Sequence, residues 1–195
     1  RGLGDVYKRQ PMAVLSSRDR SLYDFFRQKF AQVTNPPIDP LREAIVMSLE
    51  VDLGGEGNLF EETERHARRV SLTSPVLSQG KFESILALNE SGLKVQVIDA
   101  TYDPEVTTLK IALETLCQEA AAHVTGGASV LVLSDRGIAE SRIPIHSLLA
   151  TGAVHYHLIA HGLRADSNLI IETGSARDSH QIACLLGFGA TAIYP

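Results

Sequence analysis

The sequence has only two cysteines, no tryptophan and no long hydrophobic run. Its apolar runs are far shorter than the roughly twenty residues that a membrane-spanning helix needs, so we expect no membrane span. The first residues contain no apolar segment typical of a secretory signal peptide, so we expect none. Cys117 and Cys184 lie in apolar patterns and form no C-x-x-C motif. They predict two reduced thiols in a cytoplasmic protein.

No charge of one sign dominates the chain, which has 18 Lys and Arg against 23 Asp and Glu and a formal net charge of -5. Its densest basic run, ERHARR, also contains a glutamate and follows two more acids. A nucleic-acid-binding protein concentrates positive charge on one face, so we expect no nucleic-acid partner. Hydrophobic residues make up 44% and charged residues 21%, which predicts a packed globular core.

The chain divides into segments that differ in composition and in hydrophobic periodicity. Residues 1–10, RGLGDVYKRQ, show no periodicity, and we interpret them as a non-native cloning scar or a mis-joined reading frame. Residues 11–195 form the domain, which we expect to be incomplete because the chain stops directly after a strand-like run. Within this domain we expect a helical part over 12–92 and a part of alternating strands and helices over 93–195.

Apolar side chains recur at helical spacing in the first part. One stripe predicts a helix from Leu22 to Val33 with Ser21 as its N-cap. Asp39 and Pro40 predict the start of a second helix that continues through Leu49 and ends at the glycines after residue 53. A short strand over 70–72 and a short helix after residue 78 follow.

Short β-branched runs alternate with amphipathic stretches in the second part, which is typical of parallel strands joined by crossover helices. We therefore predict an α/β fold: a helical N-terminal part followed by parallel βα units, as a partial barrel-like domain or an open doubly wound sheet. The glycine that precedes each of the last strands favours the barrel-like form. The expected strands are 94–99, 128–133, 168–171 and 190–193, and the expected helices are 104–124, 144–162 and 176–186.

Charged residues follow the predicted strands, where parallel α/β folds bind their ligands. Asp135 and Glu172 have the chemistry of an acid and a base, and Arg136 or Arg177 that of an anion clamp. These residues predict, as one alternative, an independent flavin- or phosphate-binding barrel enzyme. The other alternative is structural: Asp135 with Arg136, and Glu172 with Arg177, form polar layers that close the strand ends or contact a neighbour.

Two further patterns suggest ligands only weakly. His157 and His161 have the four-residue spacing of zinc ligands on a helix, but no third ligand is evident, so we expect no metal. Gly187-Phe188-Gly189 lies between a predicted helix and a strand, whereas a phosphate-binding loop follows a strand and begins a helix. We therefore expect a helix C-cap there.

The most distinctive loop is TNPPIDP, residues 34–40, whose three prolines predict a rigid extended turn. It is part of one of several blocks by which the chain, from Met12 to Pro195, resembles the central domain of the glutamate synthase large subunit. That block is QVTNPPIDPLREAIVMSLE. The others include PMAVLS, GGEGNLFE, ERHARRVSLTSPVLS, VLSDRG, IPIHSLLATGAVHYHLI and IIETGSARDSHQIACLLGFGATAIYP.

The resemblance implies a place in an oxidoreductase that makes two L-glutamates from L-glutamine, 2-oxoglutarate and a reductant. The central domain of that family has no known catalytic residue, so it implies no catalytic, cofactor or metal site in this chain. It implies FMN and an iron–sulfur cluster in a separate downstream domain. Expected partners are the amidotransferase and FMN domains of the same polypeptide, and a small reductase subunit is a further candidate. A plant-type enzyme would be plastidial rather than cytoplasmic.

The family's central domain also helps to wall an ammonia passage between the two catalytic domains. We expect the rigid loop to be either a plain connector between helices or part of that wall. In the second case the residues near the passage are Thr34, Asn35, Ile38 and Asp39.

Overall fold

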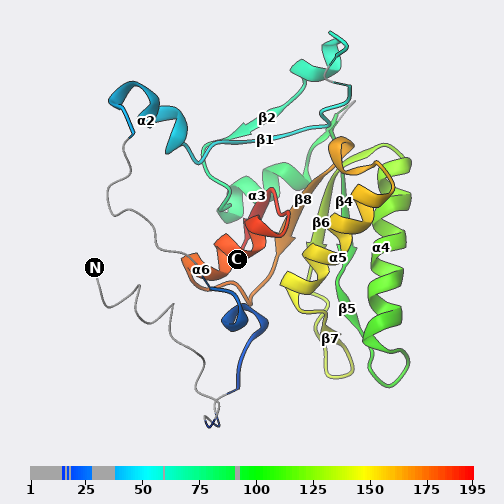
Figure 1. The fold of residues 1–195 in the computed structure, drawn as a ribbon. Helices are drawn as coiled ribbons and strands as arrows, with labels where there is room; N and C mark the ends of the chain where they lie inside the picture. The colour runs from blue at the N-terminus through cyan, green and yellow to red at the C-terminus, as the bar shows by residue number, and fades with distance from the viewer. Residues whose placement is uncertain (1–14, 16, 18, 28–37, 59, 91–92) are drawn as a thin grey trace. The chain divides into compact units, whose positions relative to one another are not determined.

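The computed structural model describes residues 15, 17, 19–27, 38–58, 60–90 and 93–195 (Figure 1). The chain divides into two compact units, Arg1–Ser48 and Leu49–Pro195, which are described here one at a time. Most of the described structure belongs to the second unit.

The first unit contains a 3-10 turn, η1 (Leu22–Phe25), and a helix, α2 (Pro40–Val46). The Asp39 carboxylate accepts hydrogen bonds from the backbone N–H groups of Leu41 (3.1 Å) and Arg42 (3.0 Å), which confirms the predicted N-cap. Two boundaries differ from the predictions. The first helix is wrong as far as it is described, because Phe26 is already extended. The second ends at Val46 rather than Leu49.

A sheet of order β3-β4-β6-β8-β9 organises the second unit. Strands β4 (Leu93–Asp99), β6 (Ala128–Ser134), β8 (Asn168–Glu172) and β9 (Ala192–Tyr194) are parallel, and β3 (Asn89–Glu90) pairs antiparallel with β4. The parallel strands are adjacent in chain order, as in part of a barrel, but over the described residues the sheet is open. The predicted α/β class with parallel βα units is confirmed.

Burial explains why the parallel strands were readable from the sequence. Every residue of β6 and β8 is buried, so the centre of each strand is a continuous apolar run rather than an alternating one. A small antiparallel pair, β5 (Thr101–Tyr102) and β7 (Ile143–Pro144), extends beyond the C-terminal end of β4.

Three crossover helices join the parallel strands: α4 (Leu109–Thr125), α5 (Ser147–Ala160) and α6 (Ser179–Gly187). Figure 1 shows α4 and α5 side by side along the sheet. A side chain caps the N-terminus of each of these helices: Thr108 accepts from Ile111 N–H, His146 from Leu148 N–H and Asp178 from Gln181 N–H. No helix in the described part of the chain is long and apolar enough to cross a membrane.

The other elements are a two-stranded ribbon, β1 (Val51–Leu53) with β2 (Val70–Leu72), the helix α3 (Gln79–Leu86), and the 3-10 turns η2 (Glu64–Ala67) and η3 (Arg164–Asp166). The strand β2 matches the short strand expected over 70–72, whereas β1 was not predicted. Its pairing partner lies about twenty residues away along the chain (Val51 faces Leu72), which local periodicity does not reveal.

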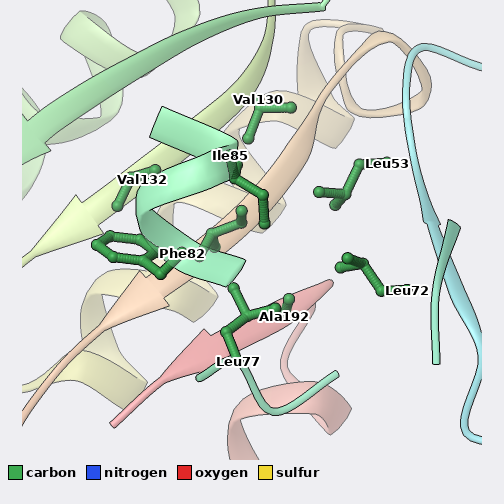
Figure 2. Packing of buried hydrophobic residues seen from close by; sticks show 9 residues of the cluster. Leu53, Leu72, Leu77, Phe82, Ile85, Val130, Val132 and Ala192 are labelled. Atoms are coloured by element: carbon green, nitrogen blue, oxygen red, sulfur yellow. The ribbon is translucent and has the colours of Figure 1, made fainter. Parts of the chain in front are cut away.

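The ribbon and α3 enclose a core cluster with the sheet (Figure 2). Figure 2 shows Phe82 and Ile85 of α3 beside Val132 and Val130 of β6, with Leu53 and Leu72 of the ribbon adjoining them. A buried amide also ties the ribbon to the sheet: Asn168 Nδ2 donates to the carbonyls of Gly54 (2.9 Å) and Ser129 (3.3 Å). The sheet face that would line the interior of a closed barrel is therefore filled by the chain's own side chains. The fully buried cluster comprises Leu53, Leu72, Leu77, Phe82, Ile85, Val130, Val132, Ile170 and Ala192.

Candidate functional site

Polar side chains gather where β6, β8 and β9 end. The parallel register places Ser134 opposite Glu172, and Glu172 opposite Tyr194. Asp135, Arg136 and Thr173 follow directly on these strand ends. We call these six residues, Ser134, Asp135, Arg136, Glu172, Thr173 and Tyr194, the strand-end cluster. This is the edge of a parallel sheet at which α/β proteins bind ligands, so it is the first place to look for chemistry.

Glu172 is at the centre of the strand-end cluster, and its side chain is only 9% exposed. The Ser134 hydroxyl donates to Glu172 Oε2 over 2.6 Å, and the Arg136 guanidinium forms an ion pair with Oε1. Both carboxylate oxygens are thus engaged by protein donors, as a buried carboxylate requires. A general base needs a lone pair directed at a substrate, and the described contacts of Glu172 are with protein groups.

Arg136 also lies against Tyr194, which stacks on Phe82. The guanidinium lies 5.7 Å from the centre of the Tyr194 ring, with Nη2 at 3.5 Å from the tyrosine hydroxyl. The Tyr194 ring in turn stacks on Phe82 of α3, with ring centres 4.3 Å apart. Because Phe82 belongs to the core cluster, the position of Arg136 is coupled to the packing of the fold.

Asp135 begins a second chain of polar contacts. It accepts a hydrogen bond of 2.5 Å from the Thr173 hydroxyl, which also lies 2.9 Å from the Ser175 hydroxyl. Ser175 reaches Ser147, the first residue of α5, at 2.8 Å. The β6 and β8 loops are therefore linked to each other and to the start of α5 through side chains.

The structure brings together three of the four strand-end residues singled out from the sequence. Asp135, Arg136 and Glu172 are in the cluster, but Arg177 donates from Nε to the Gly174 carbonyl (3.2 Å) in its own loop. The predicted pairings were wrong, because Glu172 pairs with Arg136 and Asp135 bonds Thr173. The geometry agrees with a polar layer that closes the strand ends.

A third set of contacts at the end of β4 was missed from the sequence. Arg142 donates from Nη2 to Asp99 Oδ2 (2.6 Å) and to the Thr101 carbonyl (3.1 Å), and from Nε to Thr101 Oγ1 (2.9 Å). Asp99 Oδ1 accepts from the Thr101 backbone (2.9 Å) and hydroxyl (2.7 Å). Gly137 passes so close that a Cβ there would lie 2.7 Å from Asp99 Oδ1. The only local signal was the position of Asp99 at a strand end, since Arg142 lies in a distant hairpin.

The histidine and glycine motifs lie at the ends of helices. The helix α6 ends at Gly187, which confirms the predicted helix end, and Gly189 has φ of +111°. His157 and His161 have ring centres 4.2 Å apart; burial, and then His161, lower the pKa of His157. Over the part of the chain that the structure describes, no three His, Cys, Asp or Glu side chains are grouped as metal ligands.

The remaining residues singled out from the sequence are the two cysteines and four residues of the proline-rich loop. Cys117 and Cys184 are free thiols, and burial raises the pKa of each. Of the four residues predicted near an ammonia passage, Thr34 and Asn35 lie outside the described residues. Ile38 is half-buried, and Asp39 is exposed with its carboxylate bound to the N-terminus of α2.

Comparison with known proteins identifies the family to which the chain is similar. A family model described as the glutamate synthase central domain matches residues 4–195. That match includes most of residues 1–10, whose interpretation as a scar stays a prediction. Ferredoxin-dependent glutamate synthase from rice is 47% identical over 95% of this chain. The NADPH glutamate synthase large chain of Bacillus subtilis is 43% identical over 99%, and the NADH glutamate synthase of Schizosaccharomyces pombe 42% over 99%. The chain spans only 9–12% of the length of these three relatives.

Proposed function

The chain belongs to the family of glutamate synthase central domains, and we propose that it acts as a non-catalytic spacer within such an enzyme. The reaction of the whole enzyme converts L-glutamine, 2-oxoglutarate and a reductant into two L-glutamates. In this proposal the spacer holds an amidotransferase domain and an FMN domain at a fixed separation. It also helps to enclose the route by which ammonia travels between them.

The observation that carries the proposal is the self-contained pairing of the strand-end cluster. A barrel enzyme leaves acids, bases and donors at this edge directed into an open site. Here Glu172 is bound on both oxygens by Ser134 and Arg136, and Asp135 is bound by Thr173. A spacer needs rigidity instead of an open site. The same contacts supply it, because they link neighbouring strands and loops into one network.

The short length of the chain relative to its relatives supports the choice of partners. Some nine-tenths of each relative lies outside the matched part, which is where we place the amidotransferase domain, the FMN domain and its iron–sulfur cluster. A small reductase subunit is a further proposed partner. The three relatives are named for different reductants, ferredoxin, NADPH and NADH, which supports placing the choice of electron donor outside this chain. The rice relative is named as chloroplastic, and we propose the cytoplasm or a plastid as the location.

The ammonia route depends on the rigid loop before α2. Ammonia reacts only as the neutral molecule, and contact with bulk water would protonate it. We assign Thr34, Asn35 and Ile38 to the wall of this route. Asp39, the next residue after Ile38, fixes the end of the loop by holding the start of α2.

The test uses the full-length enzyme with Ile38→Trp, which adds bulk to the half-buried loop residue. We expect glutamine hydrolysis to continue while glutamate formation falls several-fold, so that the ratio of the two rates rises. Ile45→Trp is the matched control, because Ile45 lies on α2 and is 79% exposed. A folded Ile38→Trp enzyme with an unchanged ratio would show that the loop is only a connector.

A second experiment separates the spacer from the alternative of an independent flavin- or phosphate-binding enzyme. The purified chain is mixed with FMN and passed over a desalting column. The spacer proposal expects no FMN to co-elute with the chain. A retained yellow chromophore, lost on Arg136→Ala, would favour the alternative.

A further inference from the structure

A concave site lies beside the end of β4, where Asp99 is the register neighbour of Ser134 in the strand-end cluster. It is a cavity of about 510 Å³ between α4 and the β5–β7 pair. Its size falls within the range of small-molecule sites in proteins, and its position at the carboxyl end of a parallel strand is the usual one for ligands. The spacer role makes no use of this cavity.

One end of the cavity offers hydrogen-bond donors. Arg142 lines it with a guanidinium that Asp99 and Thr101 hold through three hydrogen bonds from Nε and Nη2. Among the described residues, neither the remaining Nη1 group nor the hydroxyl of Tyr102, which also lines the cavity, has a hydrogen-bond partner. A guanidinium fixed in this way is preorganised to bind a carboxylate.

Acceptors and apolar groups complete the lining. Asp103 binds the Glu105 N–H through Oδ1 only, and Glu119 contributes a second carboxylate from α4. The residues Ala112, Leu116 and Ile145 supply apolar surface. Ala112 and Glu119 are seven residues apart on α4, so the cavity extends roughly 10 Å along the helix.

The charges of the lining decide the class of ligand. Asp99 and Arg142 neutralise each other, which leaves the carboxylates of Asp103 and Glu119 as a negative surplus. Glu119 lies 3.6 Å from the neighbouring His123 ring through Oε1, which leaves Oε2 for a ligand. A simple anion is repelled by that surplus, and a simple amine leaves the fixed guanidinium unused. A molecule with one carboxylate, one ammonium and a short apolar chain satisfies every part. We propose that this cavity is a binding site for a small zwitterionic amino acid with an aliphatic side chain.

The test compares three probes that share one apolar tail. L-leucine carries both charged groups, 4-methylpentanoate lacks the ammonium, and 3-methylbutylamine lacks the carboxylate. Isothermal titration of the 195-residue chain should give saturable L-leucine binding with a Kd of about 1 mM or tighter. Each analogue should bind at least tenfold more weakly, because one set of polar groups stays unpaired.

Two variants locate the site. Ala112→Trp fills the cavity from α4 and should abolish L-leucine binding, whereas Gln118→Trp, on another face of α4, should leave it unchanged. Glu119→Gln should weaken L-leucine binding about tenfold without weakening that of 4-methylpentanoate, which has no ammonium to lose. Equal binding of all three probes, no binding at 10-fold the expected Kd, or L-leucine binding that survives Ala112→Trp would each overturn the proposal.

Discussion

Arg164 donates a hydrogen bond from Nε to Nδ1 of His155 over 3.0 Å. The same guanidinium binds the carbonyls of Ser167 and Gly189, which lead into β8 and β9. Arg164 therefore joins segments at the N-terminal edge of the sheet, as the strand-end cluster does at the C-terminal edge. Because Nδ1 accepts this bond, the His155 ring is neutral and carries its proton on Nε2.

Stability should fall in mild acid because of this contact. Burial, and then the positive charge of Arg164, lower the pKa of His155 below its ordinary value. Below about pH 6.5 the unfolded chain therefore binds a proton that the folded chain still excludes. The contribution of His155 is complete above that pH and is lost as the pH falls from there through the folded-state pKa. Urea unfolding from pH 7.5 to 5.0 should show this loss.

A substitution assigns part of that pH dependence to His155. His155→Gln keeps an acceptor for Arg164 but cannot be protonated, so its unfolding free energy should change less with pH than that of the unsubstituted chain. His123→Gln is the control, since it removes a histidine from α4 and leaves the Arg164 contact intact. The same acid slope in His155→Gln as in the unsubstituted chain would show that other groups carry the effect. Burial also lowers the pKa of His146 and His157, so some slope should remain.

Gly189 is required where it stands, for two reasons. Its φ of +111° is a conformation that residues with a side chain rarely adopt, and a Cβ there would lie 2.3 Å from His155 Nδ1. Gly189→Ala should destabilise the fold by about 2 kcal/mol or more. Gly187→Ala, two residues earlier, should be neutral or slightly stabilising, because Gly187 is helical and has open space around it. Thermal unfolding of the pair measures the difference, and equal effects would contradict this reading of the loop.

The sequence predicted the parallel strands well because their signal is local. The run over 128–133 matches β6 to within one residue, since a strand covered on both faces must be apolar throughout. Helix starts were less accurate. The run that begins at Pro104 was assigned wholly to a helix, but Asp103 and Glu105 form a turn and α4 begins at Leu109. An amphipathic pattern does not show where the first turn is replaced by a capped loop.

What the sequence could not show depends on distant partners. The ribbon strand β1 exists because β2 pairs with it and the sheet packs beside it. Glu172 was identified as a strand-end residue, yet its partner Arg136 was assigned to Asp135, its neighbour in sequence. Pairing across adjacent parallel strands follows from register, and register is fixed by packing rather than by sequence spacing.

Asn168 tests how the ribbon is attached to the sheet. Asn168→Ala leaves the carbonyls of Gly54 and Ser129 without their buried amide donor, so it should destabilise the fold by about 1–3 kcal/mol. Asn58→Ala is the control, since its bond to Glu61 is exposed and its loss should change stability by no more than about 0.5 kcal/mol. Hydrogen exchange should also show faster opening of β1 in Asn168→Ala. Unchanged exchange in β1 would mean that the core cluster alone holds the ribbon.

Substitution of Glu172 tests whether the strand-end cluster has a structural or a catalytic role. Glu172→Gln keeps the shape of the side chain and an acceptor for Ser134, but removes the charge that pairs with Arg136. It should destabilise the domain by about 1–3 kcal/mol.

In the full-length enzyme, Glu172→Gln should change the rate of glutamate formation by no more than about twofold. Loss of a general acid or base would lower it by about 10²–10⁴-fold. The control is Glu140→Gln in the exposed hairpin after β6, which should change neither stability nor rate. Because Glu172 contacts Ser134 and Arg136 rather than an open site, the two readouts should separate: stability falls while turnover is kept. A hundredfold loss of turnover with unchanged stability would instead make Glu172 a catalytic residue and end the spacer proposal.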